Sequence, residues 1–538
     1  MKRWWTVLLV VALLCAPAAG LAYTADPNLN PPGERPICKE TVPLTIGLAE
    51  NSTIPDMETN GMTLLLEEAG NFDLSFVQYP SAEFATKIDL EVMAGGENLP
   101  DVVLVGLDMD VLESYASFGM ILDLTEYYEN SAYYIPLACQ EFDYDILKYT
   151  RSEDGRYYSF PAVSASLENE TRYRTFLNIA WLDKLGLEVP TTTEAFEDVL
   201  RAFQTGDPNG NGVADEMPFM GSKDRVNEQF INYFMTPFVY TINSDNYLFI
   251  EDGALAAAYA AEAWREGLRW VAGMIRDGLI SPLTFTQDSA QIAAFVASSE
   301  QPLLGATVTA IPNLFPNMKD DELFATWAMI GPLAGPDGVR RTPYSPVTPG
   351  MNTVITKNCK NPEAAFRLCD LLCSEEFSLM TRFGIQGVDW VTPDEKDKEN
   401  FVFGALGYEP FMKEVSQWGM PNNNWWGGRG PYIRSARMLG GRVGSTGSNL
   451  LYAVGCVGAY EFVDTDLPVG RILYSKEENE FMAMTQTNLL TYARECFARF
   501  AVGDMNLDSE WDRYLAELEL LGLSEYLGIA QGAYDRLN

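Results

Sequence analysis

Between residues 42 and 105 the sequence changes repeatedly from one kind of apolar spacing to another, and this alternation constrains the fold more than any other feature. Residues 42–48, 74–80 and 101–105 are rich in branched or aromatic side chains, which is typical of strands. The stretches 57–68 and 82–93, which lie between them, favour helices. Alternating strands and helices pack as a sheet with helices on its faces. We therefore expect a layered α/β lobe.

After residue 162 the sequence becomes more helical. Thr191 and Glu194, in the segment PTTTEAF, have the spacing of a capping box, which predicts the start of a helix. Two apolar stripes at helical spacing follow, at Phe196, Val199, Leu200 and Phe203 and at Trp264, Leu268, Val271 and Ile275. A strand over residues 351–355 then precedes a helix with Asn361 as its cap and Pro362 as its first residue. Because no repeat or low-complexity linker is found, we expect intertwined lobes.

Charge and composition exclude several classes of function. The chain has 37 basic and 75 acidic residues, a formal net charge of -38, which repels nucleic acid and anionic membrane surfaces. It contains no histidine, so Ser-His-Asp triads, Cys-His pairs and histidine-ligated zinc sites are absent. A glycosidase that uses a pair of carboxylates remains an alternative, because that reaction needs only two acids.

The first 22 residues have the pattern of a signal peptide. Lys2 and Arg3 precede an apolar run over residues 4–15, and small residues follow up to Ala22. This predicts export, with the mature protein outside the cell or in the periplasm. Cys15 leaves attachment to a lipid as an alternative to cleavage, although the residues before it match a lipidation signal poorly.

The segment GDPNGNGVADEMPF, residues 206–219, resembles a calcium-binding loop. Its oxygen ligands alternate along the chain as in an EF-hand, with a glycine at the sixth position, where the loop bends sharply. The predicted ligands are Asp207, Asn209, Asn211, the carbonyl of Val213, Asp215 and Glu216. The twelfth position is Pro218 in place of the usual glutamate, so this is an EF-hand-like loop. A polar turn without metal is the alternative.

Several segments in a shared order resemble the extracellular solute-binding proteins of ABC sugar importers, of family 1 type. The similarity is to the long branch that includes the alginate-oligosaccharide-binding proteins, and it covers nearly all of the mature sequence. The segments are ENLPDVVL, GMILDLTEYYE, YYSFPA, WLDKLGLEVPTTTEAFEDVLRAF, DPNGNGVADEMPF, RDGLISPLTFTQD, KNPEAAFRLCDLL and GIQGVDW.

This resemblance implies an α/β fold with two lobes, as in periplasmic binding proteins, and a ligand cleft between lobes joined by crossing segments. An extended arm, residues 23–41, would follow the signal peptide. The first lobe would contain residues 42–162 and 343–383, and the second, more helical lobe would contain residues 163–342 and 384–538. The resemblance also implies structural calcium in the loop of the second lobe. The expected partners are a carbohydrate and the permease subunits of an ABC transporter, with no nucleic acid and a monomeric state.

Aromatic and polar residues that border the expected cleft are candidates for binding sugar, because pyranose faces pack on aromatic rings while fixed polar groups bind hydroxyls. The candidates are Tyr158, Tyr344, Trp390, Trp425, Trp426 and Arg429. The last three belong to NNNWWGGRGPY, which we expect to be a loop. In an alternative interpretation, Trp425 and Trp426 only anchor this loop to the second lobe.

The predicted function is the extracellular substrate-binding component of an ABC transporter, which captures an oligosaccharide between its lobes and does not act as an enzyme. A secreted carbohydrate-active enzyme is the alternative. A surface adhesin or structural protein is a third hypothesis.

Overall fold

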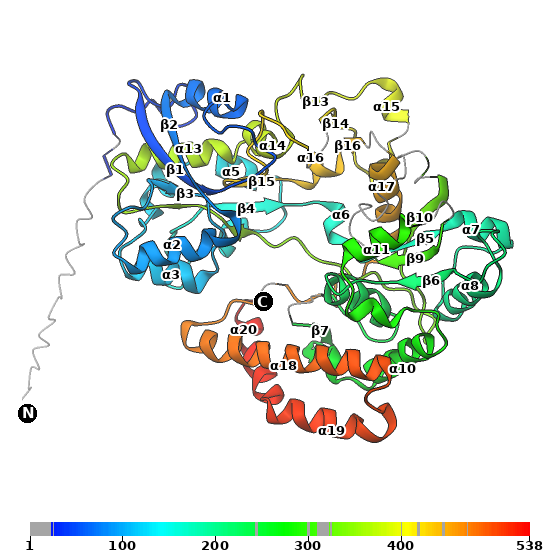
Figure 1. Cartoon of the computed structure of the whole chain (residues 1–538). Coiled ribbons are helices and arrows are strands. Elements are labelled where there is room, and N and C mark those ends of the chain that lie inside the picture. Colours follow the sequence, from blue (N-terminus) through cyan, green and yellow to red (C-terminus); the bar gives the residue numbers. More distant parts are fainter. Residues whose placement is uncertain are drawn as a thin grey trace, which may run out of the picture.

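The computed structural model describes residues 23–24, 26–242, 246–298, 302–308, 322, 325–399, 401–416, 420–443, 447–470 and 472–537. The predicted signal peptide, residues 1–22, lies outside the described residues. Figure 1 shows two lobes, one mostly blue at the upper left and one with green and red elements at the lower right. Among the described helices, none combines the length and the apolar character needed to cross a membrane.

The first lobe is a small sheet covered by helices. Its strands, in the spatial order β12-β3-β1-β2, are β1 (Val42–Ala49), β2 (Phe72–Tyr79), β3 (Val102–Val103) and β12 (Val354–Ile355). Its helices are α1 (Gly61–Gly70), α2 (Phe84–Met93), α3 (Met109–Ser117), α4 (Thr125–Asn130), α5 (Tyr134–Cys139), α13 (Pro362–Leu372) and α14 (Glu375–Phe383). Strand β1 pairs in parallel with β2 and β3, and β12 is antiparallel to β3. The predicted alternation of strands and helices is therefore confirmed.

The second lobe combines another four-stranded sheet with long C-terminal helices. Its strands, in the order β10-β5-β9-β6, are β5 (Thr175–Asn178), β6 (Met217–Met220), β9 (Leu304–Val308) and β10 (Trp327–Ile330). A hairpin of β7 (Leu248–Glu251) and β8 (Ala254–Ala257) lies beside it. The helices are α7 (Ile179–Leu185), α8 (Thr193–Thr205), α9 (Asn232–Met235), α10 (Glu262–Arg276), α11 (Ser289–Val296), α17 (Gly447–Tyr460), α18 (Lys476–Val502), α19 (Leu507–Leu520) and α20 (Leu523–Leu537).

Short 3₁₀ or π turns occur in both lobes. They lie at Ser81–Glu83, Ile146–Tyr149, Val226–Ile231, Ala258–Ala260, Pro282–Phe285 and Val402–Leu406.

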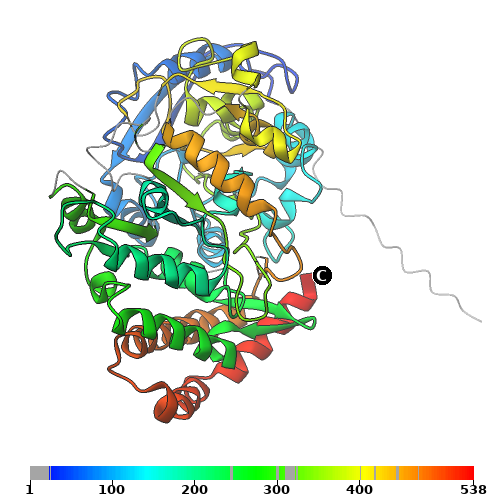
Figure 2. The ribbon, with the colours of Figure 1, turned by 90° about the vertical axis from the view of Figure 1, so that its right-hand side faces the viewer.

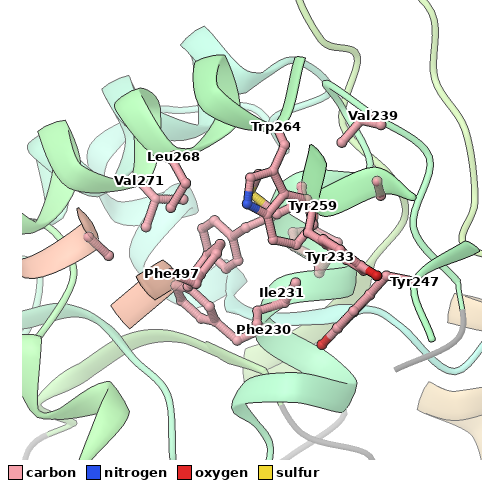
Figure 3. Close-up of a cluster of buried hydrophobic side chains, with 14 of the residues drawn as sticks. Phe230, Ile231, Tyr233, Val239, Tyr247, Tyr259, Trp264, Leu268, Val271 and Phe497 are labelled. Atoms are coloured by element: carbon pink, nitrogen blue, oxygen red, sulfur yellow. The ribbon is translucent and has the colours of Figure 1, made fainter. Parts of the chain in front are cut away.

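The core of the second lobe joins α10 to the C-terminal helices. Trp264, Leu268 and Val271 point from α10 toward Phe497 of α18, as Figure 3 shows. The ring centroids of Trp264 and Phe497 lie 5.6 Å apart. The predicted apolar stripe of α10 is thus the face that holds α18, which explains why the last helices of the chain belong to this lobe.

A three-stranded sheet connects the lobes. It contains β4 (Pro161–Ser164), which pairs antiparallel with β11 (Gly350–Met351) and parallel with β15 (Tyr432–Arg434). Helix α6 (Leu167–Glu170) follows β4 and begins the second lobe. The chain passes between the lobes after β4 and before β11, and α17 of the second lobe follows β15 and α16 in the sequence. The two-lobed fold with crossing segments is therefore confirmed.

The expected arm, residues 23–41, is packed on the first lobe. Leu29 and Cys38 form an isolated β-bridge, and both are buried in the core of that lobe. The Tyr23 hydroxyl and the Asp26 N–H donate to the carboxylate of Glu363, on α13. These contacts hold the arm on the buried central helix of the lobe.

Residues 384–443 come directly after the predicted lobe boundary. These residues form β13 (Trp390–Val391), β14 (Met412–Glu414), β16 (Arg442–Val443), α15 (Glu395–Glu399), α16 (Ala436–Gly440) and β15. Trp426 and Ile433 lie in the core of the first lobe, and the N–H of Gly61 donates to the carbonyl of Asn423. Phe403, between β13 and β14, packs instead with Leu167 of α6 and Cys456 of α17. Residues 384–443 therefore contact both lobes, and the lobe boundary at residue 384 stays a prediction. Residues from α17 onward pack on the second lobe.

Two local predictions need correction. The cap of α8 is Thr192, one residue after the predicted Thr191, and its hydroxyl accepts the N–H of Ala195 at 3.1 Å. The strand predicted over residues 351–355 is two short strands, β11 and β12, which belong to different sheets. The chain leaves the connecting sheet between them and enters the sheet of the first lobe.

Candidate functional site

A pocket of about 480 Å³ lies where the crossing segments meet both lobes, and we call it the junction pocket. Its volume is in the usual range of small-molecule sites. It is lined by Glu141, Phe142, Asp143, Tyr144, Tyr149, Ala165, Glu170, Tyr344, Pro346, Val347 and Ala436. Residues 141–149 come from the first lobe, Glu170 ends α6, and residues 344–347 precede β11. The pocket therefore joins surfaces that are far apart in the sequence. Figure 2 shows the molecule in a second view, with blue and yellow segments above and green and red ones below.

The walls of the junction pocket are aromatic. The rings of Phe142 and Tyr144 meet edge to face at 5.7 Å, and those of Tyr144 and Tyr149 at 6.3 Å. Tyr344 contacts Tyr460 of α17 in the same edge-to-face manner, at 6.4 Å. Such rings offer apolar faces with polar edges, which suits a ligand that has both.

Carboxylates lie between these rings. The side chain of Glu170 is buried, and its carboxylate accepts the Tyr460 hydroxyl. Burial raises the pKa of Glu170 to about 7, because the ionised form loses its hydration. Burial also raises the pKa of Tyr344 to about 12, and the nearby charges of Glu170 and Asp143 act in the same direction.

Glu141, in the same lining, has a pKa that is shifted in the opposite direction. Its carboxylate accepts a hydrogen bond of 2.7 Å from Arg437 and another from the Ser435 hydroxyl. Burial acts to raise the pKa of Glu141, but these two donors outweigh it and lower the pKa. Glu141 is therefore an ionised, paired acid at neutral pH.

A second pocket, of about 560 Å³, lies between the first lobe and the C-terminal helices, and we call it the outer pocket. The first lobe contributes residues 108–110 and 151–153, and the second lobe contributes residues 472–475 with parts of α18 and Arg536 of α20. The Glu478 carboxylate raises the pKa of Arg536, and Glu153 adds to this from the opposite lobe. Since residues 141–149 line the junction pocket and residues 151–153 the outer one, one segment of the first lobe borders both.

Of the six predicted ligand-binding residues, Tyr344 lines the junction pocket. Its backbone N–H donates to the Tyr240 hydroxyl at 3.1 Å, which fixes the crossing segment on the second lobe. Tyr158 is buried in the first lobe, and its hydroxyl donates to Asp154 at 2.8 Å. The structure thus does not bring Tyr158 together with Tyr344.

The three predicted tryptophans lie in the protein core. Trp425 and Trp426 are 1% and 0% exposed, and the Trp426 indole N–H donates to the Thr63 hydroxyl at 2.9 Å. Trp390 is 7% exposed, and its indole N–H donates to the carbonyl of Gly384. Trp425 and Trp426 therefore have no exposed ring face, whereas Trp390 borders a separate pocket of about 490 Å³ together with Leu65 and Gln386. The alternative, that Trp425 and Trp426 anchor their loop, describes the packing of these two residues, although the lobe they anchor to is the first.

Arg429 ties the same loop to the first lobe. Its guanidinium donates to the carbonyl of Glu50 at 3.0 Å and to that of Trp426 at 3.5 Å. Burial lowers the pKa of Arg429. Both partners are backbone carbonyls, so the side chain closes the loop and does not line either pocket.

The predicted metal loop joins α8 to β6, and its side chains fold back on its own backbone. The Asp207 carboxylate accepts the N–H groups of Gly210 and Gly212 at 3.0 and 3.1 Å. Asn209 and Asn211 donate their amide N–H groups to Asp215 at 3.0 and 3.1 Å. Asp207 itself has a φ of +48°, which an aspartate tolerates in a tight loop.

The donors of this loop suit a hard cation. Its oxygen atoms come from the carboxylates of Asp207, Asp215 and Glu216, the amides of Asn209 and Asn211, and backbone carbonyls such as that of Val213. The amide N–H groups on Asp215 supply the positive partial charge that a cation would otherwise supply. Within the described part of the chain, no three Asp, Glu, His or Cys side chains are gathered as a metal site. A bound ion would therefore depend on the amide and carbonyl oxygens as well.

Residues 65–401 match the family model of the bacterial extracellular solute-binding proteins. The chain belongs to this family. Family membership confirms the predicted resemblance, and it agrees with the two lobes described above. The family consists of binding proteins, so the alternative of a carbohydrate-active enzyme is not supported.

Individual relatives of this solute-binding protein cover almost its whole length. The fructooligosaccharide ABC transporter substrate-binding protein FusA of Streptococcus pneumoniae is 26% identical over 560 residues, 98% of this chain and 97% of FusA. The structure of FusA with kestose has a TM-score of 0.72 at 24% identity, covering 92% of this chain and 99% of that one. Another FusA structure is described as an EF-hand mutant. Alginate-binding AlgQ2 without calcium ion has a TM-score of 0.63 at 21% identity, covering 93% and 98% of the two chains.

The sequence interpretation missed most of the junction pocket. Residues 141–149, EFDYDILKY, alternate acidic and aromatic side chains, and this pattern was the available signal. Glu170 carried no signal of its own, because its burial depends on α17 and on residues 344–347, which are distant in the sequence.

Replacing Trp426 tests whether it is a core residue. We expect Trp426→Ala to lower the free energy of unfolding by about 3–5 kcal/mol, because a large buried side chain is lost. Trp426→Phe keeps most of the packing and loses the bond to Thr63, so it should cost about 1 kcal/mol. Urea unfolding measures both, and calorimetric titration of the folded variants should show unchanged ligand affinity. Lost affinity with unchanged stability would contradict this assignment.

The raised pKa of Glu170 predicts a pH dependence of stability. An acid whose pKa is higher in the folded state binds a proton more readily there, so the free energy of unfolding falls as pH rises from about 4.5 to about 7. In Glu170→Gln this contribution is removed. The difference in the free energy of unfolding between wild type and variant should therefore change by up to about 3 kcal/mol across that pH window. Urea unfolding from pH 4.5 to 8 measures it, with Glu153→Gln as an exposed control. Parallel curves for wild type and Glu170→Gln would refute the prediction.

Proposed function

We propose that this protein is the substrate-binding component of an ABC importer and that it captures an oligosaccharide between its lobes. The observation that carries this proposal is the junction pocket, in which rings and carboxylates from both lobes and a crossing segment converge. Rings that pack on sugar faces and acids that accept hydroxyl groups are the two features that carbohydrate binding needs. Support also comes from FusA, whose name refers to fructooligosaccharides.

The two pockets suggest how a chain of sugars would lie. Because residues 141–153 border both of them, a ligand can extend from the junction pocket into the outer pocket along one wall. Contacts with both lobes are gained when the lobes approach each other, so binding would favour a closed arrangement.

The proposed setting is the outer face of the cell membrane. Residues 1–22 would act as a signal peptide, with cleavage or lipid attachment at Cys15 as the two routes to the mature protein. One relative, 22% identical over 77% of this chain, is named as a lipoprotein of Bacillus subtilis. The protein would work as a monomer that delivers its sugar to permease subunits, and its charge of -38 disfavours nucleic acid as a partner.

We also propose that the loop over residues 207–216 holds structural calcium. Asp207, Asn209, Asn211, Asp215, Glu216 and the carbonyl of Val213 would be its ligands. Calcium would fix the end of α8 against the start of β6, and its oxygen shell leaves no role in a reaction. The FusA EF-hand mutant and the calcium-free AlgQ2 structure support a metal at such loops in relatives.

Sugar binding is tested by calorimetric titration with kestose, nystose, maltotriose and cellotriose. At least one should bind, and small-angle scattering should show a smaller radius of gyration with saturating ligand. Tyr344→Ala should weaken binding by roughly 10- to 100-fold, because a ring face worth about 1.5–3 kcal/mol is removed. Tyr133→Ala, an exposed tyrosine outside both pockets, is the matched control. Equal affinity in the two variants would exclude Tyr344 from the site.

Calcium is tested by metal analysis and by melting. We expect one calcium per chain in dialysed protein, and a lower melting temperature after chelation, because the carboxylates of the loop lose their counter-charge. Asp207→Ala should melt like the chelated wild type and should not respond to chelator. Asp512→Ala, an exposed acid on α19, should respond as the wild type does. A wild-type melt that chelator leaves unchanged would argue against the site.

A further inference from the structure

Carboxylates from both lobes line the junction pocket. Asp143 belongs to the first lobe and Glu170 ends the first helix of the second, and the negative charge of each acts to raise the pKa of Tyr344 in the same lining. We propose that this pocket selects uncharged sugars and rejects acidic ones, because Asp143 and Glu170 both line it and its described lining holds no cationic side chain. This inference rests on the proposed function, and it names the class of sugar that the same site takes.

No positive charge balances this pair within the described residues. The pocket lining contains no Lys or Arg, and neither Asp143 nor Glu170 forms an ion pair among the residues that the structure describes. The guanidinium near the rim, that of Arg437, is shared between Glu141 and Glu375. A ligand carboxylate would therefore add a like charge beside Glu170, whose side chain is buried, so that screening by water is weak there.

Among the described residues of the outer pocket, both cationic side chains already have partners. Arg536 donates to both oxygens of Glu478, at 3.0 and 2.5 Å. Arg151 donates to the Tyr157 hydroxyl and lies over the ring of that residue, at 5.0 Å from its centroid. Asp108, Asp110 and Glu153 line the same pocket, so its described lining has three acids against two arginines.

Uncharged sugars fit this arrangement, because each hydroxyl group can donate to a carboxylate while the ring faces pack on aromatic side chains. Hydrogen bonds to an ionised acceptor are stronger than those between neutral groups. A hydroxyl-rich ligand between Asp143 and Glu170 would thus offset the repulsion between the lobes as it binds. A uronate would increase the same repulsion.

The test compares neutral and acidic trisaccharides at pH 8, which is above the pKa of Glu170. Calorimetric titration uses kestose, maltotriose and cellotriose as the neutral probes and trigalacturonate and trimannuronate as the acidic ones. We expect the best neutral probe to bind at least tenfold more tightly than either uronate.

Variants then test whether Asp143 and Glu170 cause this preference. Asp143→Asn combined with Glu170→Gln should raise the affinity for uronate relative to the best neutral probe at least tenfold. Asp143→Asn alone should raise the ratio in the same direction, and this exposed position keeps the test informative if the double variant does not fold. Asp512→Asn, far from both pockets, should leave the ratio unchanged.

Each outcome decides the inference. A wild-type protein that prefers a uronate refutes it while leaving the proposed sugar-binding function intact. An unchanged ratio in the variants also refutes it, because the preference would then come from other groups. Binding to none of the five probes at millimolar concentration overturns the proposed function, and the inference with it.

Discussion

The sheet of β4, β11 and β15 is the constraint on which the arrangement of the lobes depends. Its strands come from three distant parts of the chain, and backbone pairing fixes Tyr432, Ile433 and Arg434 opposite Ala162, Val163 and Ser164. Since residues near each of these strands continue into the second lobe, the sheet places the junction pocket beside it. Ala165 and Ala436, which follow β4 and β15, line that pocket. The ligand site is therefore a consequence of how the lobes are joined.

Local patterns were enough to predict the layered lobes. Val42, Leu44, Ile46 and Leu48 are buried in β1, and this alternation is visible in the sequence. The stripe of α10 was equally readable, because its apolar residues recur at helical spacing. In both cases the side chains whose spacing predicts the strand or the helix are also the side chains that form the core.

Predictions failed where burial is decided by distant residues. Trp425 and Trp426 follow three asparagines and precede glycines, which reads as an exposed loop, yet the loop closes over α1 of the first lobe. The amide of Asn60 donates to the carbonyl of Trp425 at 2.9 Å, and no local pattern announces a contact across more than 300 residues. The site candidates chosen for their rings were thus mostly core residues, whereas Tyr344 was chosen for its place on a crossing segment and does line the pocket.

The packing of the N-terminal arm determines which part of the protein takes up a mechanical force applied at the start of the folded chain. Tyr23 and Asp26 are hydrogen-bonded to Glu363, which is also paired with Arg367 at 2.9 Å, one turn further along the buried helix α13. A load applied at residue 23 is therefore passed into the middle of the first lobe, which the sheet of β4, β11 and β15 joins to the second lobe. Tethered at this end, the protein would hold its first lobe steady and leave the second lobe free to swing.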